Sequence, residues 1–171
     1  MMGAVNVPLH VLFLCTGNSC RSIIGEALAE YASDGRLRGL SAGSHPTGAV
    51  NPNALAVLAR HGIVPEAPTS NTMEALAGEQ IDLVISVCDA AAGEACPLWL
   101  EATPRVHWGL PDPAHVTGDE ATVAAAFEAT FDALARRVAR LQALPLDDLD
   151  AEGLVREAAR IHAEAAPEDR A

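Results

Sequence analysis

Short apolar runs alternate with helical patterns along this chain, and a polar stretch or a turn follows most runs. Residues 7–14 and 81–87 are the clearest apolar runs, and they predict buried strands. Residues 39–42 and 105–108 predict two shorter strands. Because strands and helices alternate, we expect an α/β fold with a parallel sheet and helices on both of its faces.

The helical patterns lie between and after these strands. They cover residues 23–32, 51–60, 72–77, 117–144 and 150–163. Asn51 can cap the second helix with Pro52 at its first position, and Pro145 ends the long one. This organisation predicts one domain over residues 7–144 and an acidic, helical C-terminal extension over residues 145–171.

Composition and charge narrow the classes of function. The chain has 171 residues, half of them apolar, and a formal net charge of −12. Its 11 basic residues, all arginine, do not offset this negative charge. Nucleic acid and membrane surfaces attract basic faces, so we expect neither as a partner. It has no apolar run long enough to cross a bilayer, and residues 1–8 do not resemble a signal peptide, which predicts a cytoplasmic protein.

The strongest chemical signal is the segment Cys15–Ser22, with the sequence CTGNSCRS, between a predicted strand and a predicted helix. Backbone amides of such a loop can form a nest for a tetrahedral anion, and the helix N-terminus adds positive potential. Arg21 can hold two oxygens of the anion. We therefore expect an oxyanion-binding loop made of Thr16, Gly17, Asn18, Ser19, Cys20 and Arg21.

The same loop is expected to activate Cys15 as a nucleophile. A thiol at a helix N-terminus beside an arginine loses its proton more easily, so we expect a lowered pKa for Cys15. Ser22 is placed to donate a hydrogen bond to the thiolate. The alternative is a structural loop with two buried, inert cysteines, Cys15 and Cys20.

Two further cysteines, Cys88 and Cys96, raise the possibility of redox chemistry. Cys88 ends a strand parallel to the strand that ends in Cys15, so the two thiols should meet at one edge of the sheet. The spacings of the four cysteines do not fit a structural zinc site, and we expect no metal. If the stretch between Cys88 and Cys96 is helical, their α-carbons lie about 12 Å apart. A disulfide needs about 7 Å or less, so residues 89–95 should unwind on oxidation.

The segment VLFLCTGNSCRS closely resembles the active-site segment of low-molecular-weight tyrosine phosphatases and the arsenate reductases related to them. The resemblance continues through SAG at 41–43, NP at 51–52, SVC at 86–88 and HWGLPDP at 107–113. It covers about residues 9 to 142. It implies a three-layer α/β/α domain whose four-stranded parallel sheet has the order 2-1-3-4.

The resemblance to the thioredoxin-coupled reductases implies a reaction. Cys15 attacks arsenate while Asp112, the matching general acid, protonates the leaving oxygen. Cys88 then attacks Cys15 and releases arsenite, and Cys96 attacks Cys88 to leave a disulfide. Thioredoxin or a glutaredoxin-type protein is the expected reductant, and no cofactor is expected.

Two other functions stay open at this point. A phosphatase would share Cys15, Arg21 and Asp112, but Ala114 stands where the tyrosine phosphatases usually have a tyrosine beside the substrate. An idle oxyanion-binding module would need neither nucleophile nor acid. Glu26 and Ser41 match positions near a potassium ion in some relatives, but Asn71 replaces the usual aspartate there, so no cation is predicted.

Overall fold

The centre of the molecule is a four-stranded parallel sheet. The structure is a computed structural model that describes residues 7–88 and 100–165. Its strands are β1 (Leu9–Leu14), β2 (Leu37–Ala42), β3 (Leu83–Ser86) and β4 (Arg105–His107). They lie in the order β2-β1-β3-β4, all parallel, so the predicted α/β fold and strand order are confirmed.

Helices connect and follow these strands. They are α1 (Arg21–Tyr31), α2 (Pro52–Arg60), α4 (Glu120–Gln142) and α5 (Ala151–Ala163), with short 3-10 helices η1 (Glu74–Leu76), η3 (Pro113–His115) and η4 (Leu146–Asp148). Asn51 caps α2 as predicted, because its side chain accepts the amide of Asn53. Asp119 caps α4 in the same way, which is why that helix starts at Glu120 and not at the predicted Thr117. The helix predicted over residues 72–77 is only the single turn η1.

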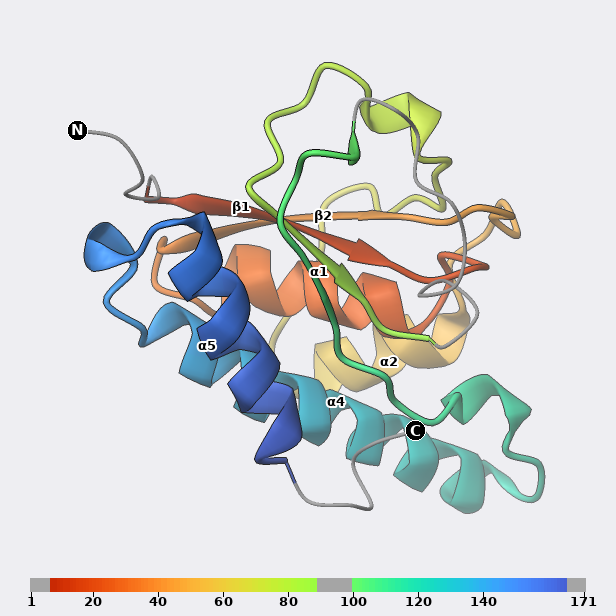
Figure 1. Cartoon of the computed structure of the whole chain (residues 1–171). Helices are drawn as coiled ribbons and strands as arrows, with labels where there is room; N and C mark the ends of the chain where they lie inside the picture. The colour runs from red at the N-terminus through yellow and green to blue at the C-terminus, as the bar shows by residue number, and fades with distance from the viewer. Residues whose placement is uncertain (1–6, 89–99, 166–171) are drawn as a thin grey trace.

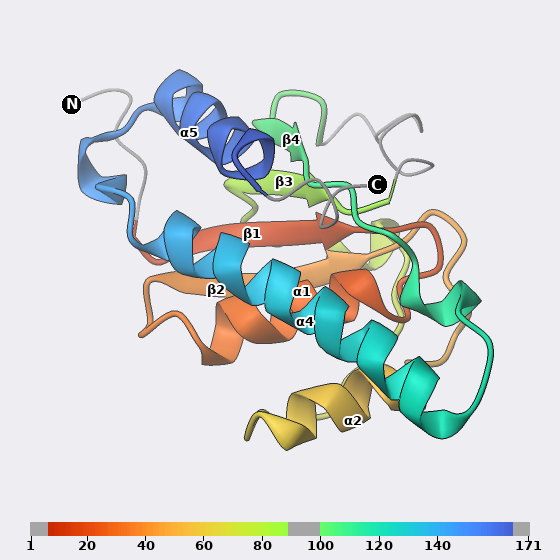
Figure 2. The ribbon, with the colours of Figure 1, turned by 90° about the horizontal axis from the view of Figure 1, so that it is seen from below.

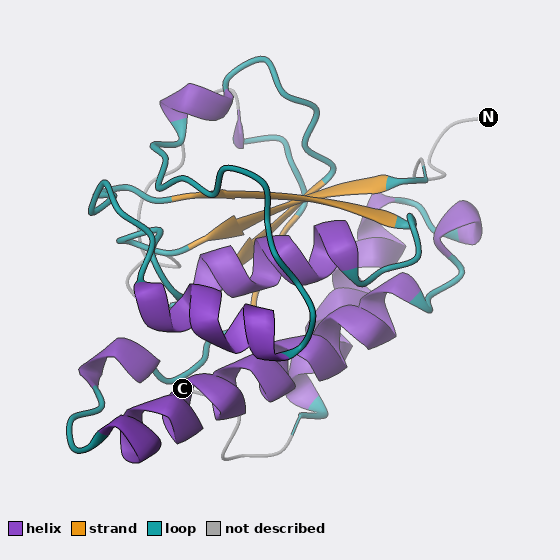
Figure 3. Ribbon diagram, turned by 180° about the vertical axis from the view of Figure 1, so that it is seen from behind, coloured by secondary structure: helices purple, strands orange, loops and turns teal. Residues whose placement is uncertain are grey.

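The helices are distributed unevenly about the sheet. Figures 1 and 3 show α1, α2 and α4 on one side of it. α1 packs on β1 and β2, and α2 lies outside, against α1 and α4. The connection over residues 63–82, which contains η1, crosses the other side. Within the described residues this second face therefore carries a turn-rich connection, since Pro65, Pro68 and Gly78 limit any helix there, and the short helix predicted over residues 72–77 is reduced to η1.

The described part of the C-terminal extension packs on the rest of the fold. α5 lies along β4 and α4, as Figure 2 shows. Trp108, which is fully buried, donates its indole N–H to the carbonyl of Ala158 at 2.9 Å. Leu154 and Ile161 also join the core. In the part of the chain described, no helix is both long and apolar enough to cross a membrane.

Candidate active site

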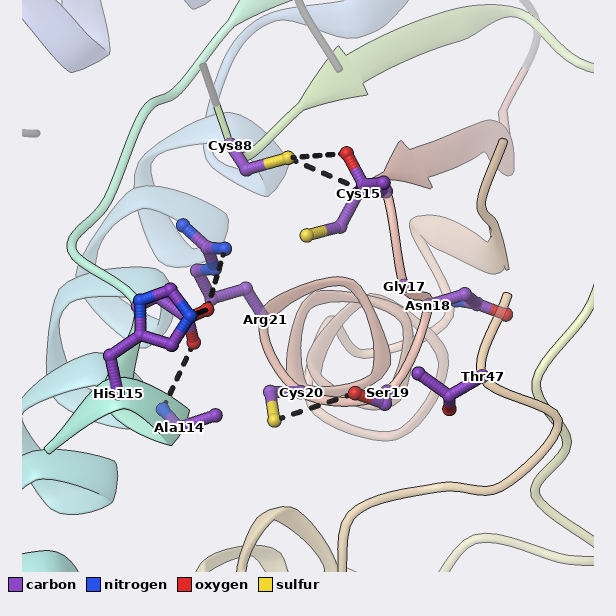
Figure 4. Close-up of a pocket in the computed structure, with 12 residues that line it drawn as sticks. Cys15, Gly17, Asn18, Ser19, Cys20, Arg21, Thr47, Cys88, Ala114 and His115 are labelled. Carbon is purple, nitrogen blue, oxygen red and sulfur yellow. Dashed lines mark hydrogen bonds and ion pairs between the residues drawn. The ribbon is translucent and has the colours of Figure 1, made fainter. Parts of the chain in front are cut away.

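A cavity of about 530 Å³ opens at the carboxyl ends of β1 and β3. Figure 4 shows the side chains around it. Its lining brings together every residue of the predicted oxyanion loop with Cys88 and Asp112. The complete lining is Cys15, Thr16, Gly17, Asn18, Ser19, Cys20, Arg21, Thr47, Cys88, Asp112, Ala114 and His115.

Neighbouring backbone holds the loop in place from outside. Three loop carbonyls, those of Thr16, Gly17 and Ser19, accept hydrogen bonds of 3.0 Å from the amides of residues 45, 47 and 51. Within one peptide unit the C=O and the N–H point in opposite directions. Anchoring the carbonyls outward therefore turns the amides of the same peptides toward the cavity, as an anion nest requires.

Asn18 braces the loop from inside. It is fully buried and adopts a positive φ of 44°, which asparagine tolerates better than most residues. Its Nδ2 donates to Ser22 Oγ at 2.9 Å, and its Oδ1 accepts the amide of Asn71 at 2.6 Å. The predicted bond from Ser22 to the Cys15 sulfur is not among the contacts of this structure. Ser22 Oγ accepts the hydrogen bond from Asn18 and so helps to hold the loop, while its own hydroxyl hydrogen is still able to donate.

Gly43, which follows β2, lies directly against the loop backbone. A β-carbon at this position would lie 2.4 Å from the carbonyl oxygen of Thr16 and 2.7 Å from that of Cys15. Neither oxygen belongs to a side chain that could move away. The glycine of the SAG motif is therefore required by contact with the anion loop.

Arg21 is the first residue of α1, and its side chain reaches across the cavity. The side chain is 11% exposed, and its Nη1 donates to the carbonyl of Leu110 at 2.7 Å. Its Nη2 lies 3.4 Å from Asp112 Oδ2. Its Nε is buried and has no hydrogen-bond partner. A buried donor without a partner at the wall of an amide-lined loop is what a bound anion would satisfy.

The two carboxylate oxygens of Asp112 have different partners. Oδ1 accepts the amide of Ala114 at 2.9 Å and thereby caps η3. Oδ2 points toward the cavity, where it faces Arg21 and lies 3.4 Å from His115 Nε2. The turn role and the proposed acid role of this residue are thus compatible, because the first fixes the carboxylate that the second would use.

Cys88 lies beside Cys15, although the two are far apart in the sequence. β1 and β3 are neighbours, and Leu14 pairs with Ser86, so the residues that follow each strand come together. The Thr16 amide donates to the Cys88 sulfur at 3.4 Å. Cys15, Cys20 and Cys88 are all buried and carry no disulfide. The meeting of two thiols predicted from the strand ends is confirmed.

The neighbouring thiol reverses the predicted pKa shift of Cys15. The hydrogen bond with Cys88, followed by burial, raises the pKa of the Cys15 thiol. The Arg21 guanidinium and the backbone of Gly17 act to lower it, as predicted, but they are weaker in this arrangement. The expected lowered pKa is therefore wrong while Cys88 lies against Cys15. Burial also raises the pKa of Cys20, which contacts Ser19.

Two lining residues, Thr47 and His115, were not identified from the sequence. Thr47 lies in a turn-rich loop, and only its backbone bond to Gly17 brings it to the cavity. His115 could have been found, because it follows Asp112 by three residues and a single helical turn places both on one face. Cys96 and the predicted unwinding of residues 89–95 lie outside the described residues.

The Glu26 and Ser41 pair behaves as a hydrogen-bonded pair between α1 and β2. The Ser41 hydroxyl donates to Glu26 Oε1 at 2.6 Å. Burial raises the pKa of Glu26 to about 7, and the hydrogen bond from Ser41 only partly offsets this. Asn71, the third residue of the set, uses its backbone to contact Asn18 and Gly43.

Comparison with known proteins gives relatives over most of the chain. An arsenate reductase from Halalkalibacterium halodurans is 36% identical over 128 residues, which are 75% of this chain and 91% of the relative. The solved structure of an arsenate reductase in the phosphate binding state superposes with a TM-score of 0.66 at 29% identity, covering 79% of this chain and 97% of that one.

A second solved structure, of an arsenate reductase from Archaeoglobus fulgidus, has a TM-score of 0.63 at 26% identity and covers 77% of this chain and 98% of that one. The family profile described as low molecular weight phosphotyrosine protein phosphatase matches residues 10–154. That match includes the loop, Cys88, Asp112 and the start of α5. The chain therefore belongs to the low molecular weight phosphotyrosine protein phosphatase family.

Proposed function

We propose that this protein is an arsenate reductase that uses Cys15, Cys88 and Cys96 in turn. The observation that carries the proposal is the second thiol in the cavity: Cys88 contacts the Thr16 amide beside Cys15. Reducing arsenate to arsenite takes two electrons, and two thiols that form a disulfide supply two. Hydrolysis of a phosphate ester has no use for a second thiol at this place.

The reaction begins with arsenate bound by the loop amides and Arg21. Cys15 passes its proton to an oxygen of the bound dianion, and its sulfur attacks arsenic. Asp112 protonates the departing oxygen, which leaves as water. Cys88 then attacks the Cys15 sulfur, and the electron pair of the sulfur–arsenic bond goes to arsenic. Arsenite leaves, and Cys15 and Cys88 are joined.

Cys96 completes the relay in this proposal. It attacks Cys88, frees Cys15 and leaves a disulfide between Cys88 and Cys96, with residues 89–95 unwound. A dithiol protein, thioredoxin or a glutaredoxin-type reductant, then restores the thiols. Relatives named as arsenate reductases support this assignment over the phosphatase alternative. So does the cavity lining, which in the described residues has no Phe, Tyr or Trp ring to flank an aryl phosphate.

The test compares two assays on the same preparation. Arsenate-dependent oxidation of thioredoxin and of glutaredoxin is followed side by side, and hydrolysis of para-nitrophenyl phosphate is measured under the same conditions. We expect repeated turnover of arsenate with one of the reductants. Rapid hydrolysis of the aryl phosphate, with no arsenate reduction by either reductant, would favour the phosphatase.

A further inference from the structure

The cavity contains a titratable side chain that the proposed reaction does not yet use. His115 Nε2 lies 3.4 Å from Asp112 Oδ2, the same oxygen that lies 3.4 Å from Arg21 Nη2. The two residues are three apart around η3, and both line the cavity. Figure 4 shows the His115 ring on the same side of the cavity as the Arg21 guanidinium.

An acid at this position needs a supply of protons. An aspartic acid is ordinarily ionised near neutral pH, so a general acid of this type must gain a proton in each turnover. The Asp112 side chain is only 23% exposed, and its Oδ1 is occupied by the amide of Ala114. The His115 side chain is 85% exposed and contacts the remaining oxygen. An imidazole exchanges protons with water readily in the physiological pH range.

We propose that His115 is a proton relay for Asp112, an inference that rests on the proposed arsenate reduction. Asp112 gives its proton to the oxygen that leaves arsenic and takes one from His115 Nε2. The neutral imidazole then regains a proton from water. The sulfur–arsenic bond forms as the arsenic–oxygen bond breaks, the oxygen leaves as water, and no electrons are transferred in this step.

The surroundings leave Asp112 as the group through which His115 acts. Besides these two, the titratable and charged residues that line the cavity are Arg21 and the thiols of Cys15, Cys20 and Cys88. α4 packs against η3. Where it borders Pro113 and Val116, it contributes no titratable group from the described residues: Ala126, Ala129, Thr130 and Ala133. The pH dependence of kcat should therefore be determined by Asp112 and His115 together.

Two substitutions separate proton transfer from positioning. His115→Ala removes both the contact and the proton, whereas His115→Gln keeps a hydrogen-bond donor near Asp112 but cannot relay a proton. Because His115 is largely exposed, both variants should fold like the wild type. We expect both to lower kcat for arsenite release about tenfold with little change in KM. Because an imidazole ordinarily exchanges its proton in the physiological pH range, wild-type kcat should fall toward alkaline pH, and this fall should vanish in both variants.

Added imidazole provides the decisive readout. It should restore His115→Ala several-fold and should not restore Asp112→Asn, in which the acid itself is lost. His61→Gln, an exposed histidine at the end of α2 and outside the cavity, serves as the matched control and should keep wild-type kinetics.

Normal activity of His115→Gln, or failure of imidazole to restore His115→Ala, would overturn the relay alone. Wild-type protein that releases no arsenite would overturn the proposed function and the relay together. The two failures are therefore distinguishable.

Discussion

The two walls of the cavity are held very differently. The anion loop of residues 15–22 is fixed by backbone bonds from three neighbouring residues and by the buried side chain of Asn18. The opposite wall, residues 110–115, contacts the loop through Arg21, whose guanidinium bonds to Leu110 and faces Asp112. The rigid wall suits binding, because an anion nest must be organised before the ligand arrives. The second wall carries the Asp112 carboxylate, which faces Arg21 and His115.

Gly43→Ala should displace the anion loop, and we expect it to have the largest effect of the substitutions proposed here. The new methyl group would lie closer to the carbonyl oxygens of Thr16 and Cys15 than non-bonded atoms can approach, so the loop must shift. Overpacking of this kind costs about 1–3 kcal/mol of stability. Phosphate affinity, measured by calorimetry, should fall about 100-fold or more, since misplaced amides no longer converge on the anion. Gly153→Ala, in α5 and outside the cavity, is the control for the loss of a glycine, because its φ is not positive and the atoms nearest its added methyl group belong to side chains. Unchanged phosphate binding in Gly43→Ala would contradict the rigid-loop account.

Asp112→Asn should remove the acid from the wall of residues 110–115 and leave the anion loop unchanged. The amide keeps an oxygen that can cap η3, but it supplies no proton to the leaving oxygen. We expect kcat for arsenate to fall about 100-fold, within the usual range for a general acid, while phosphate affinity changes little. Steady-state kinetics and calorimetry on one preparation measure both. Equal losses of turnover and of phosphate affinity would mean that Asp112 shapes the binding site and is not the acid.

Cys88→Ala should have a smaller effect, a lower pKa of the Cys15 thiol in the anion loop. The hydrogen bond with Cys88 is the largest cause of the raised pKa of Cys15, so its removal leaves Arg21 and the Gly17 backbone to lower that pKa. The rate of Cys15 alkylation should therefore reach half its maximum at a lower pH, by about one unit or more. Cys20→Ala in the same background separates the alkylation of Cys15 from that of Cys20. A midpoint that stays in place or rises would show that Cys88 does not control the Cys15 thiol.

The rigid wall was predictable from the sequence, and the second wall was only partly so. A buried strand, a glycine-containing loop with Cys15 and Arg21, and a helix are consecutive in the chain, so local rules identify the nest. The approach of Cys88 followed from the parallel strand ends. The sign of the Cys15 pKa did not, because it depends on a contact between sulfur atoms that only the folded chain creates.

The remaining differences have similar causes. Asp112 was identified from its family motif, but His115 and Thr47 come to the cavity through a turn and a single backbone bond. Ser22 accepts a hydrogen bond from Asn18, a contact that depends on the exact fold of the loop and was not predicted. In the described residues the second face of the sheet carries the connection over residues 63–82, where Pro and Gly residues limit the expected short helix to the single turn η1.

The central claim is that Cys88 attacks the sulfur of the Cys15–arsenic adduct, so that the electron pair of the sulfur–arsenic bond reduces arsenic. Its most direct test is disulfide mapping, by mass spectrometry, of Cys96→Ser protein treated with arsenate in the absence of reductant. The account predicts one arsenite released per protein molecule and a disulfide between Cys15 and Cys88. Arsenite release with Cys15 and Cys88 both still reduced, or no arsenite at all, would contradict it.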